Sequence, residues 1–308
     1  MPVPAIDWIP RLGLLVAMLL WGSSFVAFKI ALAGLHPYWM LWLRMALAAL
    51  CFALLLARLR IVPPRPGDLK YWLLMVLFEP CLYFLFEAVA LANTSAAAAG
   101  MITALLPALV ALLAGIVLKE RVTPRTGAGF ALAIAGAAWL SVAAESDAQA
   151  PAPLFGNLFE LLAMLCAAGY TVLMKRLSRH YDPLFLTALQ AWAGALFFAP
   201  LLLLPSTPWP SHWPADALLA VAYLGTVITL GAYGLYNYGI SRVPAVQAAG
   251  FTNLIPVFTV MFGFAILGER FTPAQFAASA LVFAGVGLSQ WDDWRRHRTP
   301  PGAASTGS

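Results

Sequence analysis

Five charged side chains lie inside long apolar stretches of this 308-residue chain: Lys29, Arg44, Glu79, Glu87 and Glu160. A charge surrounded by hydrocarbon is costly, so each of these residues is a candidate for binding a substrate, an ion or a proton. The pattern therefore predicts a polar cavity that several of these side chains share inside an otherwise apolar protein.

Glu79, Tyr83 and Glu87 are spaced to form one stripe on a helix. Eight residues turn an α-helix by about 80° beyond two full turns and advance it by ~12 Å. Burial makes the protonation of Glu79 responsive to its surroundings, which suits a carboxylate that couples transport to protons. Arg44 can bind a substrate carboxylate as a planar fork, or it can pair with Glu160 or Glu87 as a structural bridge. Both interpretations stay open.

Aromatic residues offer a second kind of contact. Tyr233 and Tyr236 share one face of the eighth apolar stretch, where they are suited to stack on a flat or apolar substrate. Trp21, in the first stretch, either lines the same cavity or only packs against its neighbours. Lys29 lies near the end of that stretch and can extend to the membrane surface.

Two prolines, Pro107 and Pro256, lie at the centres of the fourth and ninth apolar stretches. A proline inside a helix removes one hydrogen bond and displaces the carbonyl four residues earlier. Those carbonyls belong to Thr103 and Thr252. A freed carbonyl beside a threonine hydroxyl makes a polar spot that either binds a solute or is satisfied by a neighbour. We therefore predict kinked helices with both threonines at the cavity.

Ten apolar stretches are long enough to cross a membrane, because ~20 apolar residues span ~30 Å of hydrocarbon. They cover residues 11–33, 37–57, 70–91, 96–118, 124–145, 153–174, 184–204, 216–240, 245–267 and 273–291. With 62% hydrophobic and 10% charged residues, the chain leaves room only for short loops. It is therefore predicted to be an all-α integral membrane protein with ten transmembrane helices and a disordered cytoplasmic tail over 292–308.

The last five stretches repeat the pattern of the first five. LKERVTP at 118–124 reappears as LGERFTP at 267–273, 149 residues later, and each follows one of the two prolines. A unit with an odd number of crossings is inverted in its second copy. Inverted repeats with interrupted helices are typical of secondary transporters, whose substrate site lies near mid-bilayer. The chain is thus predicted to form two inverted five-helix repeats, 1–147 and 148–291, around a central cavity.

Basic residues predict the orientation. With the amino terminus inside, fifteen of the eighteen Lys and Arg residues fall on the cytoplasmic side, and only Arg270 lies in an outer loop. This positive-inside pattern predicts that both termini face the cytoplasm of a bacterial inner (plasma) membrane. The net charge of +5 is then a consequence of topology and indicates no nucleic-acid partner. The predicted partners are the lipid bilayer, a small-molecule substrate and, in one interpretation, protons, with a monomer favoured.

Motifs of enzymes and ATP-driven pumps are missing from the sequence. It contains no HExxH, GxSxG or P-loop pattern, so no catalytic residue and no cofactor is predicted. The cysteines Cys51, Cys81 and Cys166 lie in apolar stretches without metal-ligand spacing and suit packing. We therefore expect neither an enzyme nor a metal site.

Nearly the whole chain, about 1–291, resembles the EamA-type members of the drug/metabolite transporter superfamily. The resemblance rests on LLWGSSFVAFKIAL, NTSAAAAGMITALLPALVALLAGIVLKERVTP and YLGTVITLGAYGLYNYGISRVPAVQAAGFTNLIPVFTVMFGFAILGERFTP. It implies a ten-helix basket whose cavity is lined by helices 1–4 and 6–9, with helices 5 and 10 bracing the outside. It also implies transport of small metabolites, often the export of amino acids. Glu79 and Glu87 depart from the family pattern and suggest a cationic, zwitterionic or proton-linked substrate.

The leading hypothesis is a secondary transporter that exports small metabolites such as amino acids by alternating access, coupled to protons in one version. A gradient-independent facilitator of small polar or aromatic solutes is the alternative. A membrane assembly subunit without transport activity is a third interpretation, and it predicts a dry centre with all five charges paired. The candidate cavity residues are Glu79, Tyr83, Glu87, Arg44, Tyr233, Tyr236, Thr103, Thr252 and Trp21.

Overall fold

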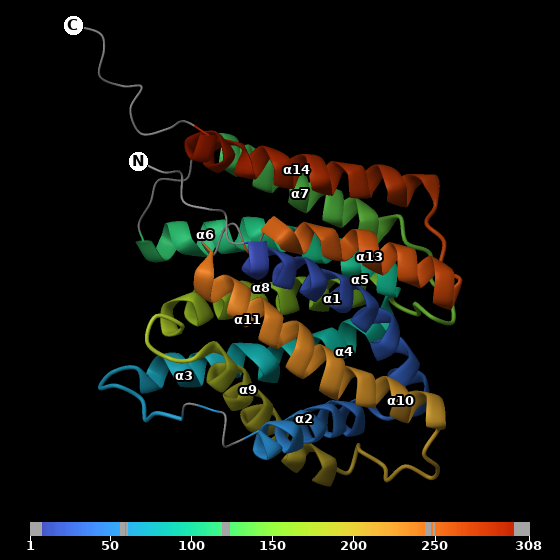
Figure 1. Cartoon of the computed structure of the whole chain (residues 1–308). Coiled ribbons are helices and arrows are strands. Elements are labelled where there is room, and N and C mark those ends of the chain that lie inside the picture. The colour runs from blue at the N-terminus through green and yellow to red at the C-terminus, as the bar shows by residue number, and fades with distance from the viewer. Residues whose placement is uncertain are drawn as a thin grey trace, which may run out of the picture.

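The computed structural model describes residues 8–55, 59, 61–118, 124–243, 248 and 250–298, and every regular element among them is a helix (Figure 1). Seven of these helices are long and apolar enough to cross a membrane, and three shorter apolar helices accompany them. Each of the ten predicted stretches coincides with one of these helices. An all-α protein with membrane-spanning helices is thus confirmed, whereas the ten-span inverted arrangement and the division after residue 147 stay predictions.

The helices of the two halves follow the predicted order. The first half contains α1 (Trp8–Gly34), α2 (Pro37–Leu54), α3 (Leu69–Val76), α4 (Tyr83–Asn93), α5 (Ala96–Ile102), α6 (Leu106–Leu118) and α7 (Pro124–Val142). The second half contains α8 (Pro153–Leu177), α9 (Pro183–Phe198), α10 (Ala215–Tyr223), α11 (Tyr233–Arg242), α13 (Ile255–Phe262) and α14 (Pro273–Arg298). Three predicted spans are therefore each built from two shorter helices, namely α3 with α4, α5 with α6, and α10 with α11.

The tail prediction was wrong in its first part. Residues 292–298 continue α14 as a helix instead of starting a disordered tail. The segment DDWRRHR contains no proline, and the residue before a proline is where a helix usually ends. The next proline is Pro300, so nothing in the sequence stops the helix earlier. The rest of the predicted tail, 299–308, lies outside the described residues.

Capping residues fix several helix starts. The Asp182 side chain accepts hydrogen bonds from the backbone N–H of Leu184 at 2.9 Å, ahead of a proline at the first position of α9. At the start of α14, Gln275 N–H donates to the Thr272 hydroxyl at 3.2 Å, and Thr272 N–H donates to the Gln275 side chain at 2.8 Å. This reciprocal pair is a capping box. The matching Thr123 lies outside the described residues.

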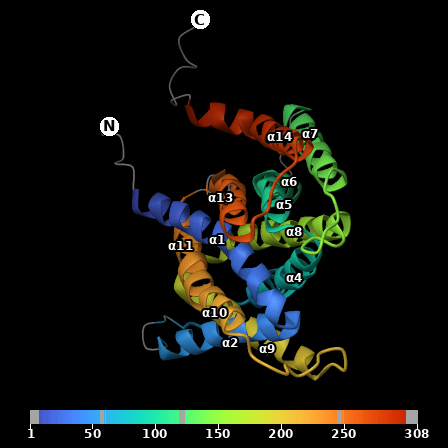
Figure 2. The same cartoon turned by 90° about the vertical axis from the view of Figure 1, so that its right-hand side faces the viewer.

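The helices lie side by side, and α1 begins at the same face at which α14 ends (Figure 1). Helices α7 and α14 pair with each other at one edge of the molecule, beside α5, α6 and α13 (Figure 2). Glycines allow their close approach, since a Cβ at Gly129 would lie 2.7 Å from the carbonyl oxygen of Gly285. These two helices match the spans that the family resemblance assigns to the outside of the bundle.

The two symmetric kinks are present, but their carbonyls are not open. Residues Thr103–Leu105 and Thr252–Leu254 form short 3-10 helices just before Pro107 and Pro256. The Thr103 carbonyl accepts from the N–H of Leu106, and the Thr252 carbonyl accepts from the N–H of Ile255. Tightening the turn to an i to i+3 bond satisfies the carbonyl that proline leaves behind. The predicted polar spots of freed carbonyls are therefore corrected to closed 3-10 turns.

The third and eighth spans are also interrupted, which the proline argument did not predict. Residues Leu77–Leu82 and Leu224–Ala232 form π-helical segments at corresponding positions of the two halves. Glu79 has φ −147° and ψ 119°, outside the helical region, because it precedes Pro80 and the residue before a proline avoids the helical conformation. These breaks turn Glu79 and Thr229 toward the centre of the bundle.

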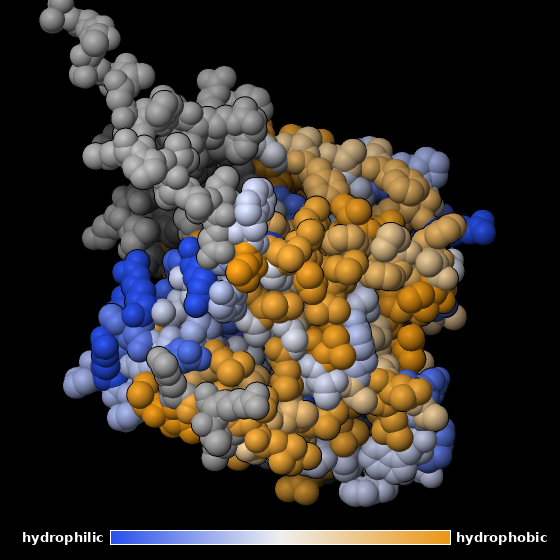
Figure 3. Space-filling model, viewed as in Figure 1, coloured by the Kyte–Doolittle hydropathy of each residue, from blue (hydrophilic) through white to orange (hydrophobic). Residues whose placement is uncertain are grey.

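The outer surface carries the apolar side chains that a membrane protein presents to lipid. Figure 3 shows an apolar band across the middle of the molecule, with hydrophilic residues at the edge where α3 begins and at the opposite edge. Large apolar side chains such as those of Leu219, Phe264 and Val257 are more than half exposed. A smaller set of polar and charged groups, among them Arg44, Glu79 and Glu160, lies buried between the helices together with many apolar side chains.

Candidate functional site

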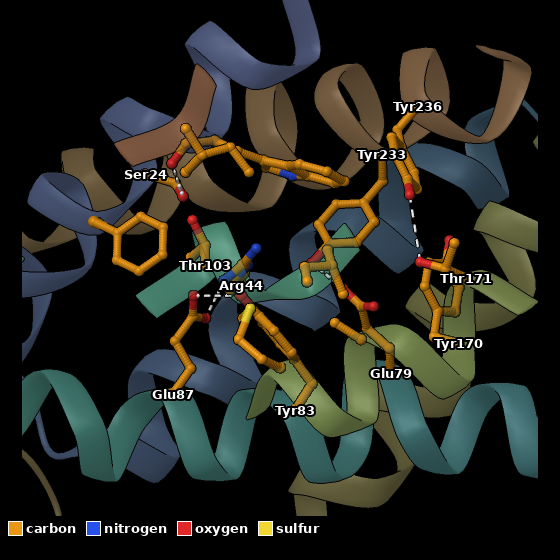
Figure 4. A pocket seen from close by; sticks show the side chains of 16 residues that line it. Ser24, Arg44, Glu79, Tyr83, Glu87, Thr103, Tyr170, Thr171, Tyr233 and Tyr236 are labelled. Atoms are coloured by element: carbon orange, nitrogen blue, oxygen red, sulfur yellow. Dashed lines mark hydrogen bonds and ion pairs between the residues drawn. The ribbon is translucent and has the colours of Figure 1, made fainter. Parts of the chain in front are cut away.

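A cavity lies at the centre of the bundle, between α1, α2, α4, α8, α11 and the kinks before α6 and α13 (Figure 4). The free space between its side chains is about 40 Å³, enough for a few water molecules, so the lining side chains must move apart before a solute as large as an amino acid can bind. Its lining residues are Trp21, Ser24, Phe25, Arg44, Glu79, Tyr83, Glu87, Thr103, Leu106, Met164, Ala167, Tyr170, Thr171, Tyr233, Tyr236 and Ile255. Charged, hydroxyl and aromatic groups thus face one space.

Arg44 is the cation of this cavity and is almost completely buried. Its Nε donates to the hydroxyl of Thr229 at 3.2 Å, and the hydroxyl of Thr229 donates in turn to the carbonyl of Leu224 at 2.8 Å. The guanidinium carbon lies 4.0 Å from the centre of the Phe84 ring, a cation–π contact. One edge of the guanidinium is thus fixed, while its other nitrogens face the cavity.

Glu87 is the acidic partner of Arg44, and the contact between them is loose. The Arg44 Nη1 atom lies 4.0 Å from Glu87 Oε2, beyond hydrogen-bond distance. The other carboxylate oxygen of Glu87 accepts a hydrogen bond from the Tyr83 hydroxyl at 3.0 Å, one helix turn away. The open question of the partner of Arg44 is therefore answered in favour of Glu87. Glu160 makes no ion pair with it among the described side chains.

Glu79 enters the cavity from the break in the third span. Its carboxylate accepts a hydrogen bond from the Tyr233 hydroxyl, which joins the two halves of the chain across the cavity. The backbone carbonyl of Glu79 accepts from the side-chain amide of Gln190 on α9 at 3.3 Å. Because Glu79 has an extended backbone, its carbonyl and its carboxylate are both available to neighbouring helices.

An aromatic wall closes one side of the cavity. The Trp21 ring lies 5.0 Å from the ring of Tyr233 and 4.7 Å from that of Tyr236, measured between centroids. The Trp21 indole nitrogen is buried and has no hydrogen-bond partner among the described residues. Buried indole N–H groups usually find an acceptor. This donor is therefore available to a bound solute.

A buried polar network below the aromatic wall was not predicted. The Tyr170 hydroxyl donates to the side-chain oxygens of Asn237 and Gln190, and the Asn237 amide donates to the Thr187 hydroxyl at 2.8 Å. The Thr171 and Tyr236 hydroxyls lie 3.3 Å apart and share a hydrogen bond. The network ties α8, α9 and α11 together and so holds the aromatic wall in place.

Eight of the nine predicted cavity residues line this space. They are Glu79, Tyr83, Glu87, Arg44, Tyr233, Tyr236, Thr103 and Trp21. Thr252 is the exception, because its buried 3-10 segment packs against that of Thr103 and does not line the cavity. Glu160 is buried behind the lining. The Lys29 ammonium donates to the backbone carbonyl of Gln149 outside the cavity.

The repeat could have found the lining residues that sequence analysis missed. Trp21, Ser24 and Phe25 lie 146 positions before Ala167, Tyr170 and Thr171, and all six line the cavity. Glu87 with Tyr236 and Leu106 with Ile255 are further lining pairs, 149 positions apart. Matched positions of the two halves therefore face the same space, although their residue types differ. Across the described residues no group of His, Cys, Asp and Glu is arranged to hold a metal ion.

A helical membrane bundle around a central cavity with opposed charges has the features of a membrane transporter. The chain belongs to the EamA-like transporter family, whose model matches residues 8–142 and again residues 154–290. The identification of the drug/metabolite transporter family from sequence is therefore confirmed. So is the prediction that the protein is no enzyme, because the relatives are named transporters.

Several relatives span almost the same length. The uncharacterized transporter YcxC of Bacillus subtilis is 30% identical over 86% of this chain and 87% of its own length. The uncharacterized transporter YetK of the same species is 27% identical over 89% and 84%. A probable terminal-alkyne amino-acid exporter of Streptantibioticus cattleyicolor is 27% identical over 90% and 91%. A solved crystal structure, 24% identical, covers 94% of this chain and 99% of its own with a TM-score of 0.66, which supports the fold.

Proposed function

We propose that this transporter exports small zwitterionic metabolites such as amino acids across a bacterial inner membrane by alternating access. The observation that carries the proposal is the pair of opposite charges that line one central cavity, with Arg44 facing Glu87 at 4.0 Å. An ammonium group and a carboxylate on one small molecule complement that arrangement. The relative from Streptantibioticus cattleyicolor, by its name, exports an amino acid, which agrees with this substrate class.

Each part of such a substrate has a counterpart in the cavity. Its carboxylate is expected to bind Arg44, whose guanidinium is held by Thr229 but only loosely by Glu87. Its ammonium is expected to lie between Glu79 and Glu87. Its side chain is expected to pack on the aromatic wall beside Trp21, where aromatic faces accept flat and apolar groups.

Lys29 and Lys175 occupy matching positions in the two halves but make different contacts, and this difference supports alternating access. The Lys175 ammonium donates to the carbonyls of Ile240 at 2.8 Å and Val243 at 2.6 Å, and so fastens α8 to the end of α11. Its counterpart Lys29, 146 positions earlier, binds the Gln149 carbonyl in the loop before α8. Two halves of similar sequence in unlike states are what exchange between inward and outward openings requires.

The positive-inside pattern of the sequence supports an orientation with both termini in the cytoplasm. The face at which α1 begins and α14 ends would then be the cytoplasmic one (Figure 1). In that orientation Lys175 closes the cytoplasmic side. Accessibility of cysteines added at either end of the full chain, tested with membrane-impermeant reagent on intact cells, checks this orientation directly.

Counterflow in proteoliposomes tests the function. Vesicles containing the purified chain and loaded with an unlabelled mixture of L-amino acids should accumulate the same mixture in labelled form. Arg44→Gln should reduce the rate at least tenfold, because the carboxylate loses its guanidinium. Arg270→Gln, at an exposed site outside the cavity, is the matched control and should leave the rate unchanged. Absence of counterflow in the unmodified protein, or an equal rate in Arg44→Gln, would reject the proposal.

A further inference from the structure

Glu160 is a carboxylate without a described hydrogen-bond partner in the first third of α8. The residue is 0% exposed, and neither of its side-chain oxygens has a hydrogen-bond partner among the described residues. It does not line the substrate cavity, but Met164, one turn further along the same helix face, does. Buried polar groups are almost always satisfied, so a carboxylate in this state calls for a specific explanation.

Helix α4 provides the ionisable neighbours of Glu160. The Glu87 carboxylate is close enough to repel an ionised Glu160. Tyr83, on the same helix, also lies within range of the charge that Glu160 would carry. The two helices approach closely one turn away, where a Cβ at Gly156 would lie 2.8 Å from the carbonyl oxygen of Ala90. Glu160 thus lies directly behind the acidic side of the substrate cavity.

Within the described part of the chain, the other elements packed against α8 bring no cation to Glu160. The sequences of α5, α6 and the 3-10 turn between them contain no ionisable side chain, and Arg125 lies at the far start of α7. Helix α3 meets α8 at Arg176, which stacks on Tyr71, ~24 Å along the helix from Glu160. Helix α11 meets α8 at Thr171, through Tyr236. Glu79, in the π-helical segment, lies within electrostatic range of Cys166 and Tyr170, which follow Glu160 further along α8.

The charges around Glu160 favour its protonated, neutral form. Glu79, Glu87 and Glu160 are three buried acids, and Arg44 is the cation that the described residues place beside them. A second ionised carboxylate next to Glu87, without donor or cation, would be strongly unfavourable in a low-dielectric interior. A neutral, protonated Glu160 removes that conflict.

We propose that Glu160 is the proton-binding site of this transporter, separate from the residues that contact the substrate. In the conformation described here its carboxyl group carries a proton. The substrate places its ammonium group beside Glu87 and its carboxylate at Arg44, so its net charge is zero but its positive end faces the acidic side of the cavity. That orientation favours an ionised Glu160: the O–H bond of Glu160 breaks, the carboxylate keeps the electron pair, and the proton leaves as H3O+ in water that reaches Glu160 when the helices move apart, because the residue is buried behind the lining. Substrate and proton therefore compete, which gives exchange of one substrate for one proton.

This inference rests on the proposed function, and one measurement tests it on the unmodified protein. In a weakly buffered detergent solution, addition of the L-amino-acid mixture to the purified full chain should acidify the medium by up to one proton per bound ligand. Equilibrium dialysis with the labelled mixture, run in parallel, counts the bound ligand. Binding without any proton release would overturn the inference.

Flux measurements assign the proton to Glu160. Proteoliposomes with a pH-sensitive dye in the lumen should change luminal pH when the labelled mixture is added outside. Glu160→Gln should lose the pH change at least tenfold. Because its neutral amide imitates the protonated carboxyl group, the variant should also bind the mixture more weakly, while it still carries out counterflow at saturating concentrations. Glu145→Gln, at an exposed outer-loop carboxylate, is the matched control and should keep both. A pH change that persists in Glu160→Gln would reject the assignment.

Failure of the inference and failure of the proposed function give different results. No counterflow in the unmodified protein refutes the transport proposal itself. Counterflow without proton movement in the unmodified protein refutes only the inference and favours a gradient-independent facilitator. Should Glu160→Gln not yield a monodisperse protein, Glu160→Asp keeps a carboxyl group and should retain proton movement with an altered pH dependence. Loss of counterflow together with proton movement in a folded Glu160→Asp variant would contradict a separate proton site.

Discussion

Replacing Arg44 by methionine should reveal how strongly the central charge pair holds the bundle together. Arg44 and Glu87 are 2% and 5% exposed in their side chains and lie 4.0 Å apart. Two unit charges at that distance interact by about 4 kcal/mol at an effective dielectric constant of about 20. Removing one partner of a buried pair typically costs about 3–5 kcal/mol, because the other charge is left uncompensated. We expect a loss of about 3 kcal/mol.

Thermal unfolding of the purified protein in detergent, followed by tryptophan fluorescence, measures this loss. A change of about 3 kcal/mol corresponds to a fall in the unfolding midpoint on the order of 10 °C. The double variant Arg44→Met with Glu87→Gln should recover at least half of the fall, because it removes the buried charge that the single variant leaves behind. It should not recover stabilisation by the amino-acid mixture, since the carboxylate-binding group is still missing.

The comparison of single and double variants can refute the reasoning in two ways. If the double variant is no more stable than Arg44→Met, the two side chains do not form an energetically coupled pair. If Arg44→Met is stabilised by the amino-acid mixture as well as the unmodified protein, Arg44 does not bind the substrate carboxylate. Arg270→Met, at an exposed outer-loop site, serves as the control and should unfold at the unchanged temperature.

Three further predictions concern contacts between the halves. Tyr233→Phe removes the hydroxyl that binds Glu79 and should lower counterflow about tenfold while the protein stays folded. Glu269→Ala removes an acceptor of two backbone N–H groups at the start of α5, both at 2.8 Å, and should lower stability by about 2–4 kcal/mol in thermal unfolding. Gly129→Val places side-chain atoms against the backbone of Gly285 and should separate α7 from α14, measured as a lower unfolding midpoint.

Each of these predictions has a matched control. Tyr71→Phe changes a tyrosine outside the cavity and should not alter counterflow. Glu145→Ala removes an exposed carboxylate and should leave stability unchanged. Gly127→Val lies in the same helix as Gly129, where a Cβ meets nothing within 4 Å, and should be tolerated. Equal effects of a variant and its control would show that the contact invoked is not the cause.

Much of the fold follows from the sequence because membrane physics acts on short segments. Hydrocarbon thickness sets the length of each span, and the ten predicted stretches all coincide with helices. Helix starts followed local signals such as Thr272 with Gln275. The prediction of a disordered tail from residue 292 was wrong, because composition was used there and the segment 292–298 contains no residue that interrupts a helix. The break at Glu79 also has a local signal, since Pro80 follows it directly, although kinks were predicted only at the symmetric prolines Pro107 and Pro256.

Most residues of the candidate site could be predicted from the sequence, but their partners could not. Eight of nine predicted residues line one cavity, because buried charge and repeated aromatic positions mark the interior of a membrane protein. Tyr170 and Asn237 were missed, since a single tyrosine or asparagine within a span carries no signal of its partner. Thr252 was assigned by symmetry with Thr103. The two halves hold unlike conformations, however, so equivalent positions need not face the same space.

By itself the sequence determined that the protein is helical, membrane-embedded and polar at its centre, because the cost of placing charge in hydrocarbon depends on the residue and its depth alone. Tertiary structure decided which polar groups meet. The rotation of each helix and its approach at glycines such as Gly225, where a Cβ would lie 2.8 Å from the Arg44 carbonyl, set those distances. That packing places Arg44 beside Glu87 and leaves Glu160 with no hydrogen-bond partner among the residues that the structure describes, an outcome that no local pattern encodes.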